Sequence, residues 1–305
     1  MKKNTLFLAS VALLLISSCG FNKQFYQAEK LPAPPLHFTL LPDNNRRDTA
    51  YMDIADNKFQ PVYTDRNHQP IDLSYTLESV VFTSKDGNKL NGWFLTPRKI
   101  APNGITLLFL HGNAGNVFSQ KEGPMEFVKR GFKVFLVDYS GYGFSEGHST
   151  RKNFLADGNS ALDYMLSRPD VKGDKIVIYG QSLGGHLSAT VAAENEKKID
   201  ALVIEGAPSS HKDIAAHMFR KVGFLARMIV KDVYPAKKSI EHYHKPLLLI
   251  YSSEDQVVPI YMGHKLFDNA NQPKSFYEVK HPHIFAPEFY ADSITYKIKG
   301  MVGKQ

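Results

Sequence analysis

The sequence predicts an α/β fold in which a mostly parallel sheet carries helices on both faces. Two observations support this class. Short runs of almost purely apolar residues recur along the chain, as expected for strands that are buried on both faces. Helical patterns separate these runs, and alternation of strand and helix favours parallel pairing. The predicted strands are ITLLFL (105–110), VFLVDY (134–139), IVIYG (176–180), ALVIEGAP (201–208), LLLIYSSED (247–255) and SFYEV (275–279).

The sheet begins with an antiparallel element, and capping signals bound the helices. LESVVFTS and KLNGWFLTP (77–84 and 89–97) flank Asp86-Gly87, a typical hairpin turn. Thr150 opens one helix, which stops before Pro169. The predicted helices cover 117–130, 150–167, the residues after 182, about 260–270 and about 286–299.

Length and composition fit one large domain. The chain has 305 residues, of which 43% are hydrophobic, so residues 76–305 can form one packed core. Residues 37–75 show no clear period, and we expect an irregular segment that packs on this domain. The formal charge of +7 is spread along the chain without an arginine-rich block. We therefore expect no nucleic-acid partner and at most weak attraction to anionic lipid. We also expect a monomer.

The first twenty residues are typical of an export signal. Lys2 and Lys3 precede an apolar stretch over 6–16, which is too short for an ordinary membrane span. Ile16-Ser17-Ser18-Cys19-Gly20 resembles a bacterial lipobox, in which the cysteine is lipidated, and Cys19 is the only cysteine of the chain. We expect a signal peptide over 1–18 and a lipidated, proline-rich tether over 19–36 that lacks a core. A plain cleaved signal with an incidental cysteine is the alternative.

This reading predicts an exported protein that a lipid holds on a bacterial membrane. Gly20 follows the cysteine, and lipoproteins of two-membrane bacteria without aspartate there usually go to the outer membrane. We therefore expect the outer membrane, with the protein facing the periplasm or the surface. The predicted lipid is the membrane partner.

Gly180-Gln181-Ser182-Leu183-Gly184 carries the strongest chemical signal. A β-branched run precedes this G-x-S-x-G sequence, and HLSATVAAE, a small-residue helical pattern, follows it. Such a strand-to-helix turn is typical of a nucleophile elbow, where glycines allow a sharp bend that exposes the serine hydroxyl. An inert serine in a glycine-rich turn is the alternative.

Reactive residue types follow several of the predicted strands. Ser182, then Asp255, then His281 and His283 come in that order, each just past a strand. Acyl transfer needs a nucleophile, a base with a near-neutral pKa, and a carboxylate that orients the base. The glycine-rich loop 111–116 can supply a backbone N–H for the tetrahedral intermediate. In a parallel sheet these strand ends lie at one edge.

Four segments resemble the α/β-hydrolases, and in particular their membrane-associated α/β-hydrolase-domain members. By this resemblance Ser182 is the nucleophile, Asp255 the acid, and the N–H groups of Leu183 and Asn113 the oxyanion hole. The resemblance covers about residue 76 to the C-terminus and implies an eight-stranded-type sheet. The four segments are FLHGNAGN (109–116), VFLVDYSGYGFSEG (134–147), YGQSLGG (179–185) and SSEDQVVP (252–259).

The base is the point at which the chain departs from the family pattern. The family usually has a small residue shortly before its histidine, whereas this chain reads Val279-Lys280-His281-Pro282-His283. Spacing from the strand favours His283, and His281 is the alternative. His111 is expected to hold the oxyanion loop. Asp138 is expected to cap a turn, although it is the second candidate for the acid.

The predicted function is that of a serine hydrolase acting on a carboxylic ester or thioester. No dinucleotide or phosphate-binding loop and no zinc spacing occurs in the sequence, so we expect neither cofactor nor metal. A small cap over 209–245 would cover the site. Its MFRKVGFLARMIV is consistent with a basic amphipathic helix, either facing lipid or solvated. The alternatives are a peptidase, a lipase or lysophospholipase on the same triad, and a non-catalytic lipid-anchored envelope binding protein.

Overall fold

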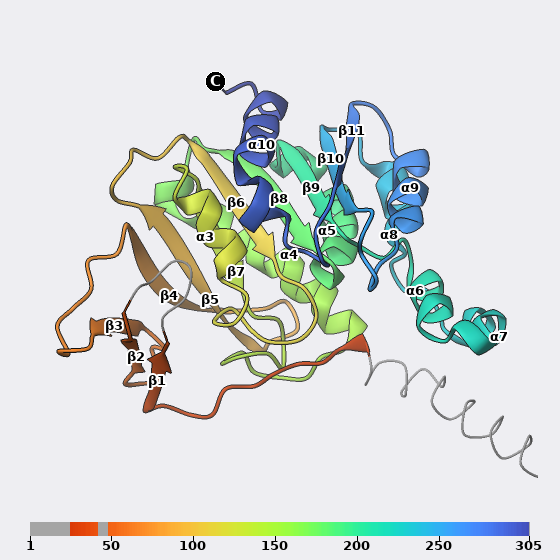
Figure 1. Ribbon diagram of the computed structural model, residues 1–305. Helices are drawn as coiled ribbons and strands as arrows, with labels where there is room; N and C mark the ends of the chain where they lie inside the picture. Colours follow the sequence, from red (N-terminus) through yellow and green to blue (C-terminus); the bar gives the residue numbers. More distant parts are fainter. Residues whose placement is uncertain (1–24, 42–47, 305) are drawn as a thin grey trace, which may run out of the picture.

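The main sheet has eight strands, and six of them are parallel. Figure 1 shows the computed structural model, which describes residues 25–41 and 48–304. The strand order is β11-β10-β9-β8-β6-β7-β5-β4, with β4 and β5 antiparallel. This confirms the predicted fold class and the hairpin. The strands are β4 (Tyr75–Thr83), β5 (Lys89–Pro97), β6 (Ile105–Leu110), β7 (Lys133–Val137), β8 (Lys175–Gln181), β9 (Ala201–Glu205), β10 (Leu247–Ser252) and β11 (Lys274–Val279).

Helices cover both faces of this sheet and form two apolar layers. Helices α3 (Glu122–Val128) and α10 (Ala286–Met301) lie on one face (Figure 1), where Phe127 and Ile294 are fully buried. The other face packs against α4 (Arg151–Ser167), α5 (Leu183–Glu194) and α9 (Ile260–Asn269). The central strands are therefore buried on both sides, which explains their unbroken apolar sequences.

Two helix starts show where local signals succeed and fail. The Thr150 side chain accepts a hydrogen bond from the Asn153 amide at 3.1 Å, so the predicted cap of α4 is confirmed. The helix predicted to begin at residue 117 begins at Glu122 instead. The Val117 amide donates to the Asp138 carboxylate at 2.9 Å, which holds that stretch as a loop.

The segment 37–75 is more regular than its sequence indicates. It contains a three-stranded antiparallel sheet, and the ring of Phe38 packs at a tilt against that of Phe118, with a ring-centre distance of 4.9 Å. The strands are β1 (Leu36–Leu40), β2 (Ala50–Ile54) and β3 (Pro61–Asp65). Apolar residues alternate with polar or less buried ones along β1 and β2, but over only five positions each, a pattern too short to stand out from the polar sequence around it.

Residues 25–31, which we call the strap, pack on the domain. Phe25 and Tyr26 are each only 6% exposed and belong to the layer on the α4 and α5 face. Lys30 forms a parallel bridge with Gly143, and the Leu31 amide donates to the Gly143 carbonyl at 3.0 Å. The expectation that the 19–36 tether lacks a core is therefore wrong for this part, because Phe25 and Tyr26 belong to the domain core. The expected signal peptide 1–18 and Cys19 lie outside the described residues.

The cap is built from short helices between β9 and β10. They are α6 (His211–Met218), α7 (Gly223–Ile229) and α8 (Ala236–Ser239). The single amphipathic helix expected over 218–230 is wrong, because a 3₁₀ turn over Arg220–Val222 divides it into α6 and α7. Within the described residues, no helix is long and apolar enough to cross a membrane.

Candidate active site

Ser182 stands on a sharp turn between β8 and α5. Its backbone has φ 51° and ψ −114°, a conformation that costs a non-glycine residue energy and that recurs at functional sites. The positive φ belongs to Ser182 itself, whereas the neighbouring glycines provide space. A Cβ on Gly184 would lie 2.0 Å from the Leu110 carbonyl oxygen, and one on Gly180 would lie 2.5 Å from the Gly184 carbonyl oxygen. The motif therefore lets β8, α5 and the end of β6 approach closely.

Ser182, His283 and Asp255 form one hydrogen-bonded chain. The distance from Ser182 Oγ to His283 Nε2 is 2.9 Å, and from His283 Nδ1 to Asp255 Oδ2 it is 2.6 Å. Because the carboxylate only accepts, His283 Nδ1 carries a proton and Nε2 is the acceptor for the serine hydroxyl. The second carboxylate oxygen of Asp255 accepts the amides of Val257 and Val258 at 2.8 and 2.9 Å. This arrangement can remove a proton from Ser182 Oγ.

The other candidates for base and acid lie elsewhere. His281 is 4% exposed, and its backbone exchanges two hydrogen bonds with Ser252 Oγ, at 3.0 and 2.6 Å. Its ring contacts the Pro282 carbonyl and stacks on Phe289, with no contact to Ser182. Asp138 caps the Val117 amide, as expected for a turn-capping carboxylate.

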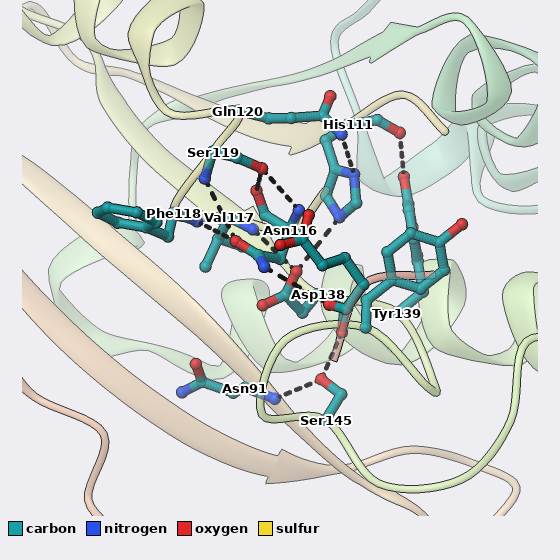
Figure 2. Close-up of polar contacts among 12 residues, drawn as sticks. Asn91, His111, Asn116, Val117, Phe118, Ser119, Gln120, Asp138, Tyr139 and Ser145 are labelled. Carbon is teal, nitrogen blue, oxygen red and sulfur yellow. Dashed lines mark hydrogen bonds and ion pairs between the residues drawn. The ribbon is translucent and has the colours of Figure 1, made fainter. Parts of the chain in front are cut away.

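His111 and Asp138 form a buried pair that supports the loop after β6. His111 Nε2 lies 3.5 Å from Asp138 Oδ1, and both side chains are fully buried. Figure 2 shows the imidazole between the Gln120 amide and the Asp138 carboxylate. Asn116 Oδ1 accepts the amides of Phe118 and Ser119 at 3.1 and 3.2 Å, which closes the loop on itself. Burial raises the pKa of Asp138.

The predicted oxyanion loop lies against the nucleophile and is held by the strap. A Cβ on Gly112 would lie 3.4 Å from the Ser182 Cβ, so the loop abuts the elbow. The Asn113 side-chain oxygen accepts the Gln27 amide at 2.7 Å and the Tyr142 hydroxyl at 3.0 Å. In the described part of the chain, the Asn113 and Leu183 amides donate no loop or cap hydrogen bond. Both remain available for an oxyanion.

Gln181 and Glu205 form a buried network that the sequence reasoning missed. Glu205, which is 1% exposed, accepts from the Tyr179 hydroxyl, the Gln181 amide nitrogen and the Ala286 amide at 2.7–2.9 Å. Gln181 also donates to the Ile284 carbonyl at 3.0 Å, next to His283. The network thus ties the elbow to the histidine loop. A lone charge at the end of the apolar strand ALVIE could have revealed it.

Two cavities meet at His283. An apolar cavity of about 300 Å³ reaches Ser182 and is lined by Phe25 of the strap and Met218 of the cap. A second cavity, of about 540 Å³, is also lined mainly by apolar surface, but its lining includes the polar side chains of Gln120 and Glu288. Among the described residues, no group of three or more His, Cys, Asp or Glu side chains is arranged to hold a metal ion.

Comparisons with known proteins agree with this architecture. The family description "alpha/beta hydrolase fold" matches residues 105–239. The Escherichia coli O157:H7 protein named "Uncharacterized protein YfhR" is 34% identical over 205 residues, which are 66% of this chain and 70% of that protein. "Alpha/beta hydrolase domain-containing protein WAV2" of Arabidopsis thaliana is 28% identical over 215 residues, 66% of this chain and 69% of that one.

A solved structure shares the fold at low sequence identity. The esterase Pf2001 of Pyrococcus furiosus superimposes with a TM-score of 0.61 at 17% identity, covering 75% of this chain and 90% of that chain. The matching family description and the sequence relatives establish the family, and the eight-stranded sheet agrees with it. The chain belongs to the α/β-hydrolase superfamily.

Proposed function

We propose that the protein is a serine hydrolase that cleaves a carboxylic ester or thioester through an acyl-enzyme on Ser182. The observation that carries the proposal is the chain of two short hydrogen bonds from Ser182 through His283 to Asp255. Superfamily membership and the esterase fold of the structural neighbour support the reaction class. The three side chains come from three separate loops and meet at the strained turn that carries Ser182. A reactive serine explains both the strain and the alignment, whereas an inert serine explains neither.

The proposed reaction follows from the atoms at the site. Ser182 Oγ attacks the acyl carbon while its proton passes to His283 Nε2, and Asp255 stabilises the resulting imidazolium. The amides of Asn113 and Leu183 hold the oxyanion of the tetrahedral intermediate. His283 then returns the proton to the leaving alcohol or thiol, which departs. Water then attacks the acyl carbon while His283 takes its proton, and the second tetrahedral intermediate releases the acid as His283 returns this proton to Ser182 Oγ.

The two cavities suggest where the halves of the substrate lie. We assign the acyl chain to the apolar cavity beside Ser182, because its lining removes hydrocarbon from water. The leaving group then faces the second cavity beside His283, where Gln120 and Glu288 can contact a polar group. A lipase or lysophospholipase uses the same arrangement with a longer acyl chain, and a peptidase uses it with an amine leaving group.

Reaction with a fluorophosphonate probe separates a hydrolase from a non-catalytic binding protein. The purified wild-type chain should be labelled stoichiometrically, and Ser182→Ala should not be labelled. Ser182→Ala should also lower kcat on p-nitrophenyl acetate by roughly 10⁴-fold or more, because only the oxyanion hole and binding remain. A clean Ser182→Ala preparation that keeps a tenth of wild-type turnover would show that the elbow serine is not the nucleophile.

We also propose that Cys19, after removal of residues 1–18, carries the lipid that holds the protein on the outer membrane. The sequence Ile16-Ser17-Ser18-Cys19-Gly20 and the lone cysteine support this. Two or more acyl chains give stable anchoring, whereas one gives marginal binding. Labelling with a clickable palmitate analogue should disappear in Cys19→Ala, which should be released or remain a precursor. Unlabelled wild-type protein that washes off membranes in high salt would contradict the anchor.

A further inference from the structure

Helix α7 presents an apolar face to the outside of the molecule. Phe224, Leu225 and Met228 lie on one side of this helix and are 77%, 47% and 67% exposed. The opposite side packs inward through Ala226, which is fully buried. Three large apolar side chains on seven residues are more than scattered surface hydrophobics. We call these three residues the cap face.

The surroundings of the cap face are basic. Residues 214–231 contain four cations, Arg220, Lys221, Arg227 and Lys231, and no acid. Arg227 and Lys237 pair with the buried Asp213 inside the cap. Lys265 of α9 also pairs with Asp213, at 3.4 Å, which ties the cap to the domain. Arg220 and Lys221 are exposed and form no ion pair within the described part of the chain. An apolar face flanked by unpaired cations is complementary to an anionic bilayer surface.

The length of chain before the strap places a membrane on this side. Phe25 packs against the ring of His211, the first residue of α6, at a centre distance of 5.6 Å. In Figure 1 the described chain begins on the side of α6 and α7. Five residues separate Cys19 from Phe25, and the six steps between the two span at most about 20 Å when fully extended. A lipid on Cys19 therefore keeps the bilayer next to the cap.

We propose that the cap face inserts into the headgroup region of the anionic bilayer that holds the protein, and that the active site takes a lipid-like acyl ester from this bilayer. The second half rests on the proposed hydrolase function. Met218 of α6 and Phe25 of the strap both line the cavity beside Ser182. Because α7 packs on α6, docking of the cap face brings this cavity to the lipid surface.

A site-specific probe tests insertion without any assay of activity. The full chain carries Phe224→Cys, labelled with an environment-sensitive dye, in vesicles of phosphatidylglycerol and phosphatidylethanolamine. Tyr296→Cys on α10 is the matched control, because Tyr296 is 80% exposed and α10 lies far from α7 in Figure 1. A lipidated Cys19 has no free thiol, so the number of labels read by mass also reports the anchor. If Cys19 reacts, the comparison is repeated in Cys19→Ser.

Brominated lipids should quench the probe at position 224 and leave position 296 in water. Equal quenching at both positions, or none at 224, would overturn the insertion.

The double variant Phe224→Ser/Met228→Ser tests delivery of the substrate from the bilayer. Its rate of hydrolysis of 4-methylumbelliferyl oleate dissolved in the vesicles should be about tenfold or more below that of wild type. The same variant should hydrolyse p-nitrophenyl acetate within about twofold of wild type, which also shows that it folds. Equal rates on the vesicle substrate would refute delivery from the bilayer, whereas a wild type inactive on both esters would refute the hydrolase and leave the quenching result intact.

Discussion

Two histidine–aspartate pairs lie at the same edge of the sheet, and their surroundings differ. His283 and Asp255 share a 2.6 Å hydrogen bond, and the histidine is 15% exposed and faces Ser182. His111 and Asp138 are 3.5 Å apart and have no exposed surface. The same two residue types can thus serve a reaction when a nucleophile and substrate can reach them, or support a loop when they are sealed in the core.

The largest effect is expected when each histidine of the loop after β11, His283 or His281, is replaced by alanine in turn. His283→Ala should lower kcat almost as much as Ser182→Ala, by roughly 10⁴-fold, because the three residues act as a unit. His281→Ala should lower kcat about tenfold or less, since the His281 ring contacts the Pro282 carbonyl and aromatic neighbours, and the backbone bonds to Ser252 remain. Steady-state rates on p-nitrophenyl acetate decide this. The reverse order would move the base to His281.

Matched amide substitutions separate the two aspartates. Asp255→Asn should reduce kcat by about 10³- to 10⁴-fold with little change in stability, because the amide no longer favours the required imidazole tautomer. Asp138→Asn should reduce kcat by about tenfold or less but lower the free energy of unfolding by about 2–4 kcal/mol, since it disrupts a sealed pair. Urea unfolding and kcat are measured on both variants. A large kcat loss with unchanged stability in Asp138→Asn would make Asp138 part of the chemistry.

A third kind of histidine sharpens the comparison through pH. Burial lowers the pKa of His186 to about 4, and it lowers the pKa of His211 well below its ordinary value. Between pH 6.5 and 4 the unfolded chain binds protons that the folded chain does not, so stability falls as pH decreases through this range. His186 alone should make the free energy of unfolding about 2 kcal/mol smaller at pH 5 than at pH 8. His186→Gln should flatten this dependence in thermal unfolding, and His148→Gln, at an exposed histidine, should leave it unchanged.

The smallest expected effect concerns the oxyanion loop. Tyr142→Phe removes one of the two donors to the Asn113 side-chain oxygen, while the Gln27 amide remains. One neutral hydrogen bond is worth about 0.5–1.5 kcal/mol, so kcat should fall by about two- to tenfold with KM nearly unchanged. Tyr164→Phe, on α4, should leave kcat as it is. A rise in KM alone would indicate that Tyr142 shapes substrate binding instead.

The sequence was sufficient for the sheet and for the residues that the structure brings together at its edge. Buried strands are continuous apolar runs, and the elbow and Asp255 follow such runs directly, so local patterns predict them. The later start of α3 depends on Asp138, which is 21 residues from the Val117 amide that it binds. The strap depends on contacts such as Gln27 with Asn113, 86 residues apart. No local pattern contains those partners. The strands β1 and β2 do alternate in burial, but over only five positions each, which is too few to mark a strand in the sequence.

Glu205 is a polar residue at a strand end that the sequence reasoning did not single out. Reactive or polar side chains at strand ends identified Ser182 and Asp255, and Glu205 ends β9 in the same way. Its role depends on three donors from β8 and the start of α10, which only the assembled fold brings to it. Burial raises its pKa, a further sign of an unusual environment.

Mapping the acyl-enzyme tests the central claim most directly. The purified chain is mixed with p-nitrophenyl acetate, quenched in acid before turnover is complete, digested and sequenced by mass spectrometry. The account predicts an acetyl group on Ser182, together with a burst of p-nitrophenol, and neither in Ser182→Ala. Two results would contradict it: an acetyl group on another residue of an active wild-type protein, or hydrolysis of the ester by Ser182→Ala at the wild-type rate.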